Sequence, residues 1–242
     1  MKDLTVWVDG EFYGHGRPEA GLMAHGLHYG TGVFEGIRCY PTDHGPAIFR
    51  LDAHMTRFAA GAAALSMSVD IEKMGAAALE LLRRNDQQSA YIRPISYYDR
   101  GGLSLDVDQL ETRSVVATLP WTSHLGDSAQ HAGVKLRTGS IRRTSSQAVP
   151  PLKLTGNYVN SILAKLEATR ADYDEALFTD DLGMVCEATG ENVFMVNNGR
   201  ITAVAHPDAL PGITRATVME LTGAEERSVS LCLLYTSPSP RD

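Results

Sequence analysis

The chain has 242 residues, 43% of them hydrophobic and 21% charged, with a formal net charge of −7 and a pI near 5.6. These values are typical of a soluble globular protein with one large or two modest domains, and the acidic balance argues against nucleic acid or an anionic membrane as a partner. No apolar run approaches the length of a membrane span, and the N-terminus, MKDLTVWVDGEF, has no long apolar run that would indicate a signal peptide. The three cysteines form no CxxC pair, so we expect no disulfide framework, no zinc site and a cytoplasmic location.

The first half of the chain predicts strands and helices in blocks. Residues 4–13 read as a hairpin around Asp9-Gly10, and 28–40 mix glycines with β-branched and aromatic residues, which favours strands with close backbone contacts. Asp52 and Asp70 are each expected to cap a helix. Three more strands are predicted over 89–98, 114–119 and 133–138.

The second half continues the same pattern. A helix is predicted over 157–170 and strands over 174–179 and 191–203, the latter folded into a hairpin at Asn198-Gly199. Another helix is expected to start near Gly212–Ile213. Since strands and helices occur in blocks with several hairpins, the sequence predicts an α+β fold rather than a doubly wound parallel sheet.

Lys153 is the centre of the most informative segment, PPLKLTGNYVNS (150–161). It follows a Pro-Pro pair and precedes a helical pattern, which predicts a short rigid loop that leads into a helix. An isolated amine, the carboxylate of Glu187 in CEATGENVF and the helix start in LPGITR (210–215) are together what a pyridoxal phosphate enzyme needs. Glu191 competes with Glu187, because strand alternation would place both on one face.

Two arginines are candidate ligands for anions. Arg57, on the first predicted helix, is either a phosphate ligand or a solvated helix residue. Arg93 lies in an apolar, β-rich run and requires a carboxylate partner, either that of a substrate or that of a structural salt bridge. His25 and His28 have no further ligands at metal-binding spacing, so no metal site is predicted.

The chain resembles the branched-chain amino acid aminotransferases of the fold-type IV pyridoxal phosphate family over nearly all of residues 4–222. The segments that carry the resemblance are HGLHYGTGVFEGIRCY (25–40), FRLDAHMTRF (49–58), SAYIRP (89–94), LPW (119–121), KLTGNY (153–158), CEATGENVF (186–194) and LPGITR (210–215). The resemblance implies a two-domain α+β architecture, an N-terminal α/β sandwich and an incomplete C-terminal pseudo-barrel that enclose the cofactor. It also implies a homodimer, which completes the pocket, or a higher homo-oligomer.

The resemblance implies a role for each matching residue. Lys153 matches the catalytic Schiff-base lysine, Tyr158 the tyrosine that bonds the cofactor's phenolic oxygen, and Glu187, rather than Glu191, the partner of the pyridine nitrogen. The implied phosphate ligands are Arg57, Ile213 and Thr214. The implied substrate pocket consists of Tyr29, Phe34, Gly36, Tyr91, Arg93 and Trp121.

The function that follows from the resemblance is transamination of L-leucine, L-isoleucine or L-valine with 2-oxoglutarate, with pyridoxal 5′-phosphate as cofactor and amino acids and 2-oxo acids as partners. Other fold-type IV enzymes are the alternatives: a D-amino acid aminotransferase, an (R)-selective amine transaminase or an aminodeoxychorismate lyase. A chain that keeps the fold but does not catalyse is a further alternative.

The sequence suggests four parts. We expect an N-terminal α+β domain over 1–122, an interdomain linker over 123–132, a truncated cofactor-binding domain over 133–223 and a non-native or disordered tail over 224–242. The last seven residues, TSPSPRD, extend no helix or central strand. The family normally continues with a Ser-Gly-Thr-Ala-type turn that is not found here, so exposed apolar surface is expected.

Overall fold

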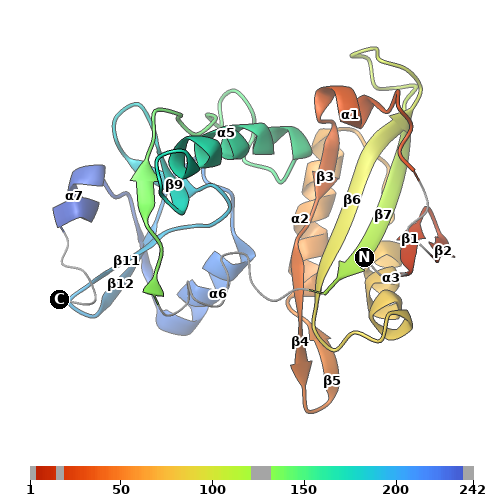
Figure 1. Cartoon of the computed structure of the whole chain (residues 1–242), viewed down its shortest axis with the longest axis horizontal. Helices are drawn as coiled ribbons and strands as arrows, with labels where there is room; N and C mark the ends of the chain where they lie inside the picture. The colour runs from red at the N-terminus through yellow and green to blue at the C-terminus, as the bar shows by residue number, and fades with distance from the viewer. Residues whose placement is uncertain (1–3, 15–18, 121–131, 237–242) are drawn as a thin grey trace. The chain divides into compact units, whose positions relative to one another are not determined.

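The structure, a computed structural model, describes residues 4–14, 19–120 and 132–236, and the chain divides into two compact units (Figure 1). Unit 1 comprises Met1–His124 and Leu152–Gly156, and unit 2 comprises Leu125–Pro151 and Asn157–Asp242. Sequence reasoning assigns Lys153 to the second domain, whereas its contacts place it in unit 1. The predicted linker, except for its last residue, lies outside the described residues.

Unit 1 is built on a seven-stranded antiparallel sheet with the order β2-β1-β7-β6-β4-β5, in which β3 also pairs with β6. Its strands are β1 (Val6–Val8), β2 (Glu11–Tyr13), β3 (Gly32–Phe34), β4 (Ile37–Thr42), β5 (Gly45–Ile48), β6 (Ala90–Arg100) and β7 (Glu111–Leu119). The predicted hairpin is confirmed, because β1 and β2 pair across Asp9-Gly10, whose φ angles are 48° and 105°. Positive φ at both positions is what a two-residue hairpin turn requires.

Three helices belong to unit 1: α1 (His25–Tyr29), α2 (Leu51–Ala64) and α3 (Ile71–Arg84). Asp70 caps α3 as predicted, since its side chain accepts a hydrogen bond from Lys73 N at 3.0 Å. The prediction for α2 was wrong: the cap residue is Arg50, and Asp52 lies within the first turn. A carboxylate there still stabilises the positive end of the helix dipole.

The apolar core of unit 1 lies where α2 and α3 pack on the sheet (Figure 1). Alternation along β6 directs Ala90, Ile92 and Tyr98 into this core. The same alternation places Tyr91 and Arg93 on the other face of the strand. The sheet therefore presents two residues of the predicted substrate pocket on the side opposite the helices.

Unit 2 contains two three-stranded sheets, one with the order β10-β9-β8 and the other with the order β11-β12-β13. Its elements are β8 (Leu136–Thr138), α5 (Tyr158–Thr169), β9 (Glu175–Thr179), β10 (Val185–Ala188), β11 (Phe194–Asn197), β12 (Arg200–Val204), α6 (Ile213–Thr222), β13 (Glu225–Arg227) and α7 (Leu231–Thr236). The turn at Asn198-Gly199 is confirmed, with φ angles of 50° and 76°. None of the described helices has the length and apolar character needed to cross a membrane.

Residues 224–236, which the sequence assigns to a non-native or disordered tail, form β13 and α7 in the structure. β13 pairs in parallel with β12, and Val229 is fully buried in a cluster with Leu177 and Val185. These contacts are made with residues far along the chain, so the local composition does not reveal them. Residues 237–242 lie outside the described part of the chain.

Two buried helical glycines provide a matched test of the core. A Cβ added at Gly61 in α2 would lie 2.6 Å from Val33 Cγ2, whereas one added at Gly75 in α3 would meet nothing closer than Leu51 Cδ2 at 3.9 Å. Gly61→Ala is therefore expected to lower the free energy of unfolding by about 1–3 kcal/mol through overpacking. Gly75→Ala is expected to raise it by about 0.5–1 kcal/mol. Urea denaturation measures both, and equal stabilities would contradict the packing of α2 on β3.

Candidate active site

Lys153 is held in unit 1 by a short strand-like contact. Its carbonyl accepts a hydrogen bond from Phe34 N at 3.2 Å, and the next residue, Leu154, forms an antiparallel bridge with Val33. Leu152 and Leu154 both pack on the apolar core. Because side chains alternate along an extended segment, Lys153 is directed away from that core.

The backbone just after the lysine is fixed by Gly30. The Gly30 carbonyl accepts hydrogen bonds from Thr155 Oγ1 at 2.6 Å and from Gly156 N at 3.0 Å. Gly30 has a positive φ of 68°, and a Cβ at this position would lie 2.8 Å from Gly156 Cα. The close approach of these two backbones therefore depends on glycine.

The amine of Lys153 is largely withdrawn from water and lies 4.9 Å from the centre of the Phe34 ring. Burial lowers the pKa of Lys153 to about 8; the nearby Glu35 charge raises it, whereas Arg57 and Arg93 lower it further. About a tenth of such amines are neutral at pH 7, far more than for an exposed lysine. The amine is thus suited to act as a nucleophile and a base near neutral pH.

Glu35 is a buried acid beside the lysine that sequence reasoning missed. Its carboxylate is fully buried and contacts Arg57 Nε at 2.7 Å, Arg57 Nη2 at 2.8 Å and His54 Nδ1 at 2.8 Å. Burial pushes the pKa of Glu35 up, but the hydrogen bonds from His54 and Arg57 outweigh it and leave that pKa lowered. Arg57 is only 12% exposed, so it is not a solvated helix residue.

The predicted substrate residues of β3 and β6 lie together. Arg93 Nη2 donates a hydrogen bond to the Tyr91 hydroxyl at 2.6 Å, and its guanidinium centre lies 4.7 Å from the centre of the Phe34 ring. Arg93 Nε is buried and has no hydrogen-bond partner among the described residues. A side chain at Gly36 would collide with the Tyr91 hydroxyl, so glycine keeps this cluster open.

Of the described residues predicted to bind substrate, Tyr29 does not join this cluster. Tyr29, at the end of α1, is half exposed; its ring centroid lies 4.6 Å from that of His25, and its hydroxyl donates to the Leu103 carbonyl at 3.4 Å. Trp121 lies outside the described residues. The described part of unit 1 therefore brings Phe34, Tyr91 and Arg93 together, but not Tyr29.

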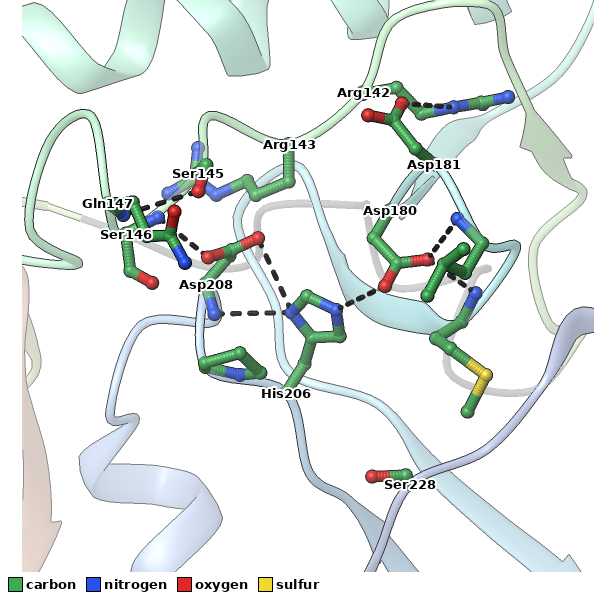
Figure 2. Close-up of a pocket in the computed structure, with 13 residues that line it drawn as sticks. Arg142, Arg143, Ser145, Ser146, Gln147, Asp180, Asp181, His206, Asp208 and Ser228 are labelled. Atoms are coloured by element: carbon green, nitrogen blue, oxygen red, sulfur yellow. Dashed lines mark hydrogen bonds and ion pairs between the residues drawn. The ribbon is translucent and has the colours of Figure 1, made fainter.

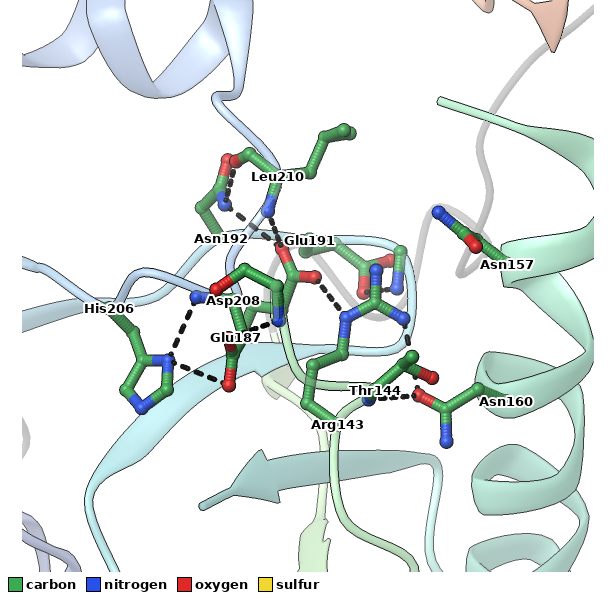
Figure 3. Close-up of polar contacts among 12 residues, drawn as sticks. Arg143, Thr144, Asn157, Asn160, Glu187, Glu191, Asn192, His206, Asp208 and Leu210 are labelled. Atoms are coloured by element: carbon green, nitrogen blue, oxygen red, sulfur yellow. Dashed lines mark hydrogen bonds and ion pairs between the residues drawn. The ribbon is translucent and has the colours of Figure 1, made fainter. Parts of the chain in front are cut away.

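In unit 2, the structure distinguishes Glu187 from Glu191 (Figure 3). Glu187 lies in β10 with a 7% exposed side chain and forms an ion pair with Arg143, from Nε to Oε1, of 2.8 Å. Its Oε2 accepts hydrogen bonds from Leu210 N at 3.0 Å and from Asn192 Nδ2 at 3.3 Å. Glu191 follows the end of the strand and is exposed, so the two glutamates do not share the face that alternation suggested.

The start of α6 adjoins this carboxylate. Gly212 is the N-cap residue and supplies no side-chain cap, so the amides of Ile213 and Thr214 open the helix. Asn192 also donates to the Leu210 carbonyl at 3.0 Å, and a side chain at Gly212 would collide with Asn192 Oδ1. The contacts of Asn192 therefore connect the glutamate to the predicted phosphate-binding turn.

A pocket of about 460 Å³ opens on the other side of Arg143 (Figure 2). None of the residues predicted from the sequence to form the site lines it. His206 Nδ1 accepts a hydrogen bond from Asp208 N at 3.2 Å, which leaves the His206 Nε2 proton for Asp180 Oδ2 at 3.3 Å. The polar groups at the centre of this pocket, His206, Asp180 and Asp208, are therefore hydrogen-bonded to one another.

Lys153 is expected to be acylated at lower pH than the other lysines, because its neutral fraction rises around pH 8. Lys73 is the internal control, since its side chain is 73% exposed and its hydrogen bond with Asp70 raises its pKa. Competitive labelling followed by peptide mass spectrometry from about pH 6 to 11 measures both. Equal labelling midpoints would contradict the burial of the Lys153 amine.

Comparison with known proteins places these features in a family. The chain matches the model of the amino-transferase class IV family over residues 32–235. It is 36% identical over 223 residues to the branched-chain-amino-acid aminotransferase of Pseudomonas aeruginosa, which covers 91% of this chain and 73% of that protein.

The fold is similar to solved branched-chain amino acid aminotransferases. The Escherichia coli structure matches with a TM-score of 0.92 and 34% identity, and a T.th. structure with pyridoxamine 5′-phosphate matches with a TM-score of 0.91 and 38% identity. Each match covers 98% of this chain and 81% of the other. The expected α+β, fold-type IV architecture is thus confirmed, and the chain belongs to the class IV aminotransferases as a fold-type IV relative of the branched-chain amino acid enzymes.

Proposed function

We propose that this enzyme transfers the amino group of L-leucine, L-isoleucine or L-valine to 2-oxoglutarate, with pyridoxal phosphate bound as a Schiff base to Lys153. The observation that carries the proposal is the Lys153 amine, largely buried and with its pKa lowered to about 8. The relatives' names support the substrate class. A T.th. relative complexed with N-(5′-phosphopyridoxyl)-L-glutamate supports glutamate as the second amino acid.

The donor groups of the chain fit pyridoxal phosphate. The aldehyde needs an amine that is neutral near physiological pH, which Lys153 supplies. The pyridine nitrogen needs a buried carboxylate, which Glu187 supplies, and the phosphate needs amides at a helix start, which Ile213 and Thr214 supply. Arg57 and Tyr158 are the further ligands that we propose for the phosphate and the phenolic oxygen.

In this mechanism Lys153 Nζ moves the proton. It removes a proton from the substrate α-carbon and afterwards delivers it to the cofactor, so it must be neutral at the first step and protonated before the second. A pKa near the working pH allows both states. When bound, the cofactor supplies an electron-accepting ring, and Glu187 keeps the nitrogen of that ring protonated.

The cluster around Arg93 suits a substrate that alternates between an apolar and an acidic side chain. The Phe34 ring offers an apolar surface to a leucine, isoleucine or valine side chain. The Arg93 guanidinium, held over that ring and by Tyr91, offers donors for the side-chain carboxylate of glutamate. We propose Gly36, Tyr29 and Trp121 as the remaining substrate residues and a homodimer as the assembly.

Lys153→Ala is expected to abolish covalent attachment of the cofactor and to lower kcat by about 10²-fold or more, because the base is lost. Borohydride reduction followed by peptide mapping locates the attachment, and amino transfer from L-leucine and from D-alanine is assayed in parallel. Lys73→Ala, which removes an exposed lysine, is the control. Retention of the borohydride-trapped cofactor in Lys153→Ala would refute the proposal.

Arg93→Ala is expected to raise KM for glutamate and 2-oxoglutarate far more than KM for leucine, because a guanidinium is lost that only the acidic side chain uses. A charged hydrogen bond of this kind contributes about 1.5–3 kcal/mol, which corresponds to a change in kcat/KM of about 10- to 160-fold. Steady-state kinetics with both amino acids measure the difference. Equal losses for leucine and glutamate would assign Arg93 a structural role instead.

A further inference from the structure

Arg143 is a buried cation to which the sequence assigns no role. It lies on the loop after β8, and its side chain is only 8% exposed. Besides the 2.8 Å ion pair with Glu187, its Nη1 donates to Asn160 Oδ1 at 3.2 Å, and its guanidinium centre lies 5.6 Å from the centre of the Phe178 ring. A guanidinium buried to this degree requires an opposite charge that is buried beside it.

The contacts of Glu187 divide into two kinds. Its Oε2 receives the neutral donors Leu210 N and Asn192 Nδ2, which orient the carboxylate and favour its ionised form without adding a positive charge. Its Oε1 faces the guanidinium of Arg143. A carboxylate buried to this degree favours its protonated form unless a cation compensates it.

We propose that Arg143 is a positioning residue of the transamination reaction, which holds the buried Glu187 carboxylate ionised and in a fixed orientation. The inference rests on the proposed function, in which Glu187 keeps the pyridine nitrogen of the cofactor protonated. A protonated Glu187 would lose that ability, because it would present a donor where an acceptor is required.

Asn160, in α5, connects the pair of Arg143 and Glu187 to that helix. Its Oδ1 accepts hydrogen bonds from Arg143 Nη1 and from Thr144 N, and its Nδ2 donates to the Arg142 carbonyl at 2.9 Å (Figure 3). α5 begins at Tyr158, the proposed ligand of the phenolic oxygen. One arginine therefore connects the carboxylate to the helix that bears a second cofactor ligand.

Other titratable groups lie near the pair. Figure 3 labels Asp208, His206 and Glu191 in the same close-up, with His206 in contact with Asp208, and Asp180 lies next to His206. Cys186 precedes Glu187 in β10, but burial raises the pKa of its thiol far above neutral. Any pH dependence must therefore be separated from these groups, and replacement of Glu187 itself does so.

The test combines Arg143→Met, Glu187→Gln and the double variant in the 242-residue chain. Urea denaturation of the cofactor-free proteins at about pH 8 and about pH 5.5 gives the unfolding midpoints, a range that spans the expected titration of a buried carboxyl group. Cofactor affinity and the visible absorption of the bound cofactor are measured in parallel. Arg143→Lys keeps the charge, and Arg142→Met, which removes the neighbouring half-exposed arginine, is the matched control.

We expect Arg143→Met to lower the midpoint strongly at pH 8 and less at pH 5.5. The uncompensated Glu187 binds a proton more tightly in the folded than in the unfolded chain, so its penalty falls as the pH falls. In the Glu187→Gln background this pH-dependent loss should vanish. The cofactor dissociation constant should rise by about tenfold or more in Arg143→Met, with partial recovery in Arg143→Lys and no change in Arg142→Met.

If Arg143→Met lowers the unfolding midpoint equally at both pH values, and equally with and without Glu187→Gln, Arg143 contributes packing alone. That result would overturn the proposal. If Arg143→Met does not fold, Arg143→Gln, which removes the charge but keeps a polar side chain, is compared with and without Glu187→Gln instead. The cycle on cofactor-free protein is independent of the reaction. If cofactor attachment depends on Lys153 but the stability effects of Arg143→Met and Glu187→Gln are independent of each other, only the role of Arg143 is refuted. If cofactor attachment does not depend on Lys153, the proposed function is refuted.

Discussion

A carboxylate that leaves water must be compensated by a cation, and each unit of this chain buries one glutamate under that constraint. In unit 1 Arg57 and His54 hold Glu35, and in unit 2 Arg143 holds Glu187. Burial of either glutamate favours its protonated form, and the arginine beside it opposes that effect. In unit 1 the pair lies beside Lys153, and in unit 2 it includes Glu187 itself, so charge compensation influences which protonation states the proposed chemistry can use.

The pair in unit 1 sets the conditions under which Lys153 works. Glu35 alone would hold the amine protonated, and Arg57 alone would make protonation more costly; side by side, their effects on the lysine oppose each other. Burial then remains the largest influence, and it lowers the pKa to about 8 rather than to an extreme value. An amine that populates both its neutral and its protonated form near pH 7 to 8 can serve as nucleophile, base and acid in turn.

Local signals in the sequence were sufficient where a structure depends on a few neighbouring residues. The turns at Asp9-Gly10 and Asn198-Gly199 and the cap at Asp70 are of this kind, because their geometry is determined within four residues. Asp52 shows the limit: its side chain is a good cap, but the chain enters α2 through Arg50 in a left-handed conformation. The attachment of Lys153 to β3 and of β13 to β12 depends on pairing between distant segments, which no local pattern reports.

The difference between local signals and contacts of distant segments also explains which residues of the candidate site could be predicted from the sequence. Lys153 and Glu187 lie in segments whose order of residues is informative, although only the end of β10 separates Glu187 from Glu191. Arg143 has no such signal, since it adjoins Arg142, which is half exposed and faces the exposed Asp181. An arginine at many different loop positions can reach a buried carboxylate and compensate its charge. The position of such an arginine in the sequence therefore follows no recognisable motif. The groups that keep a site in its working charge state are therefore found by burial and distance, not by motif.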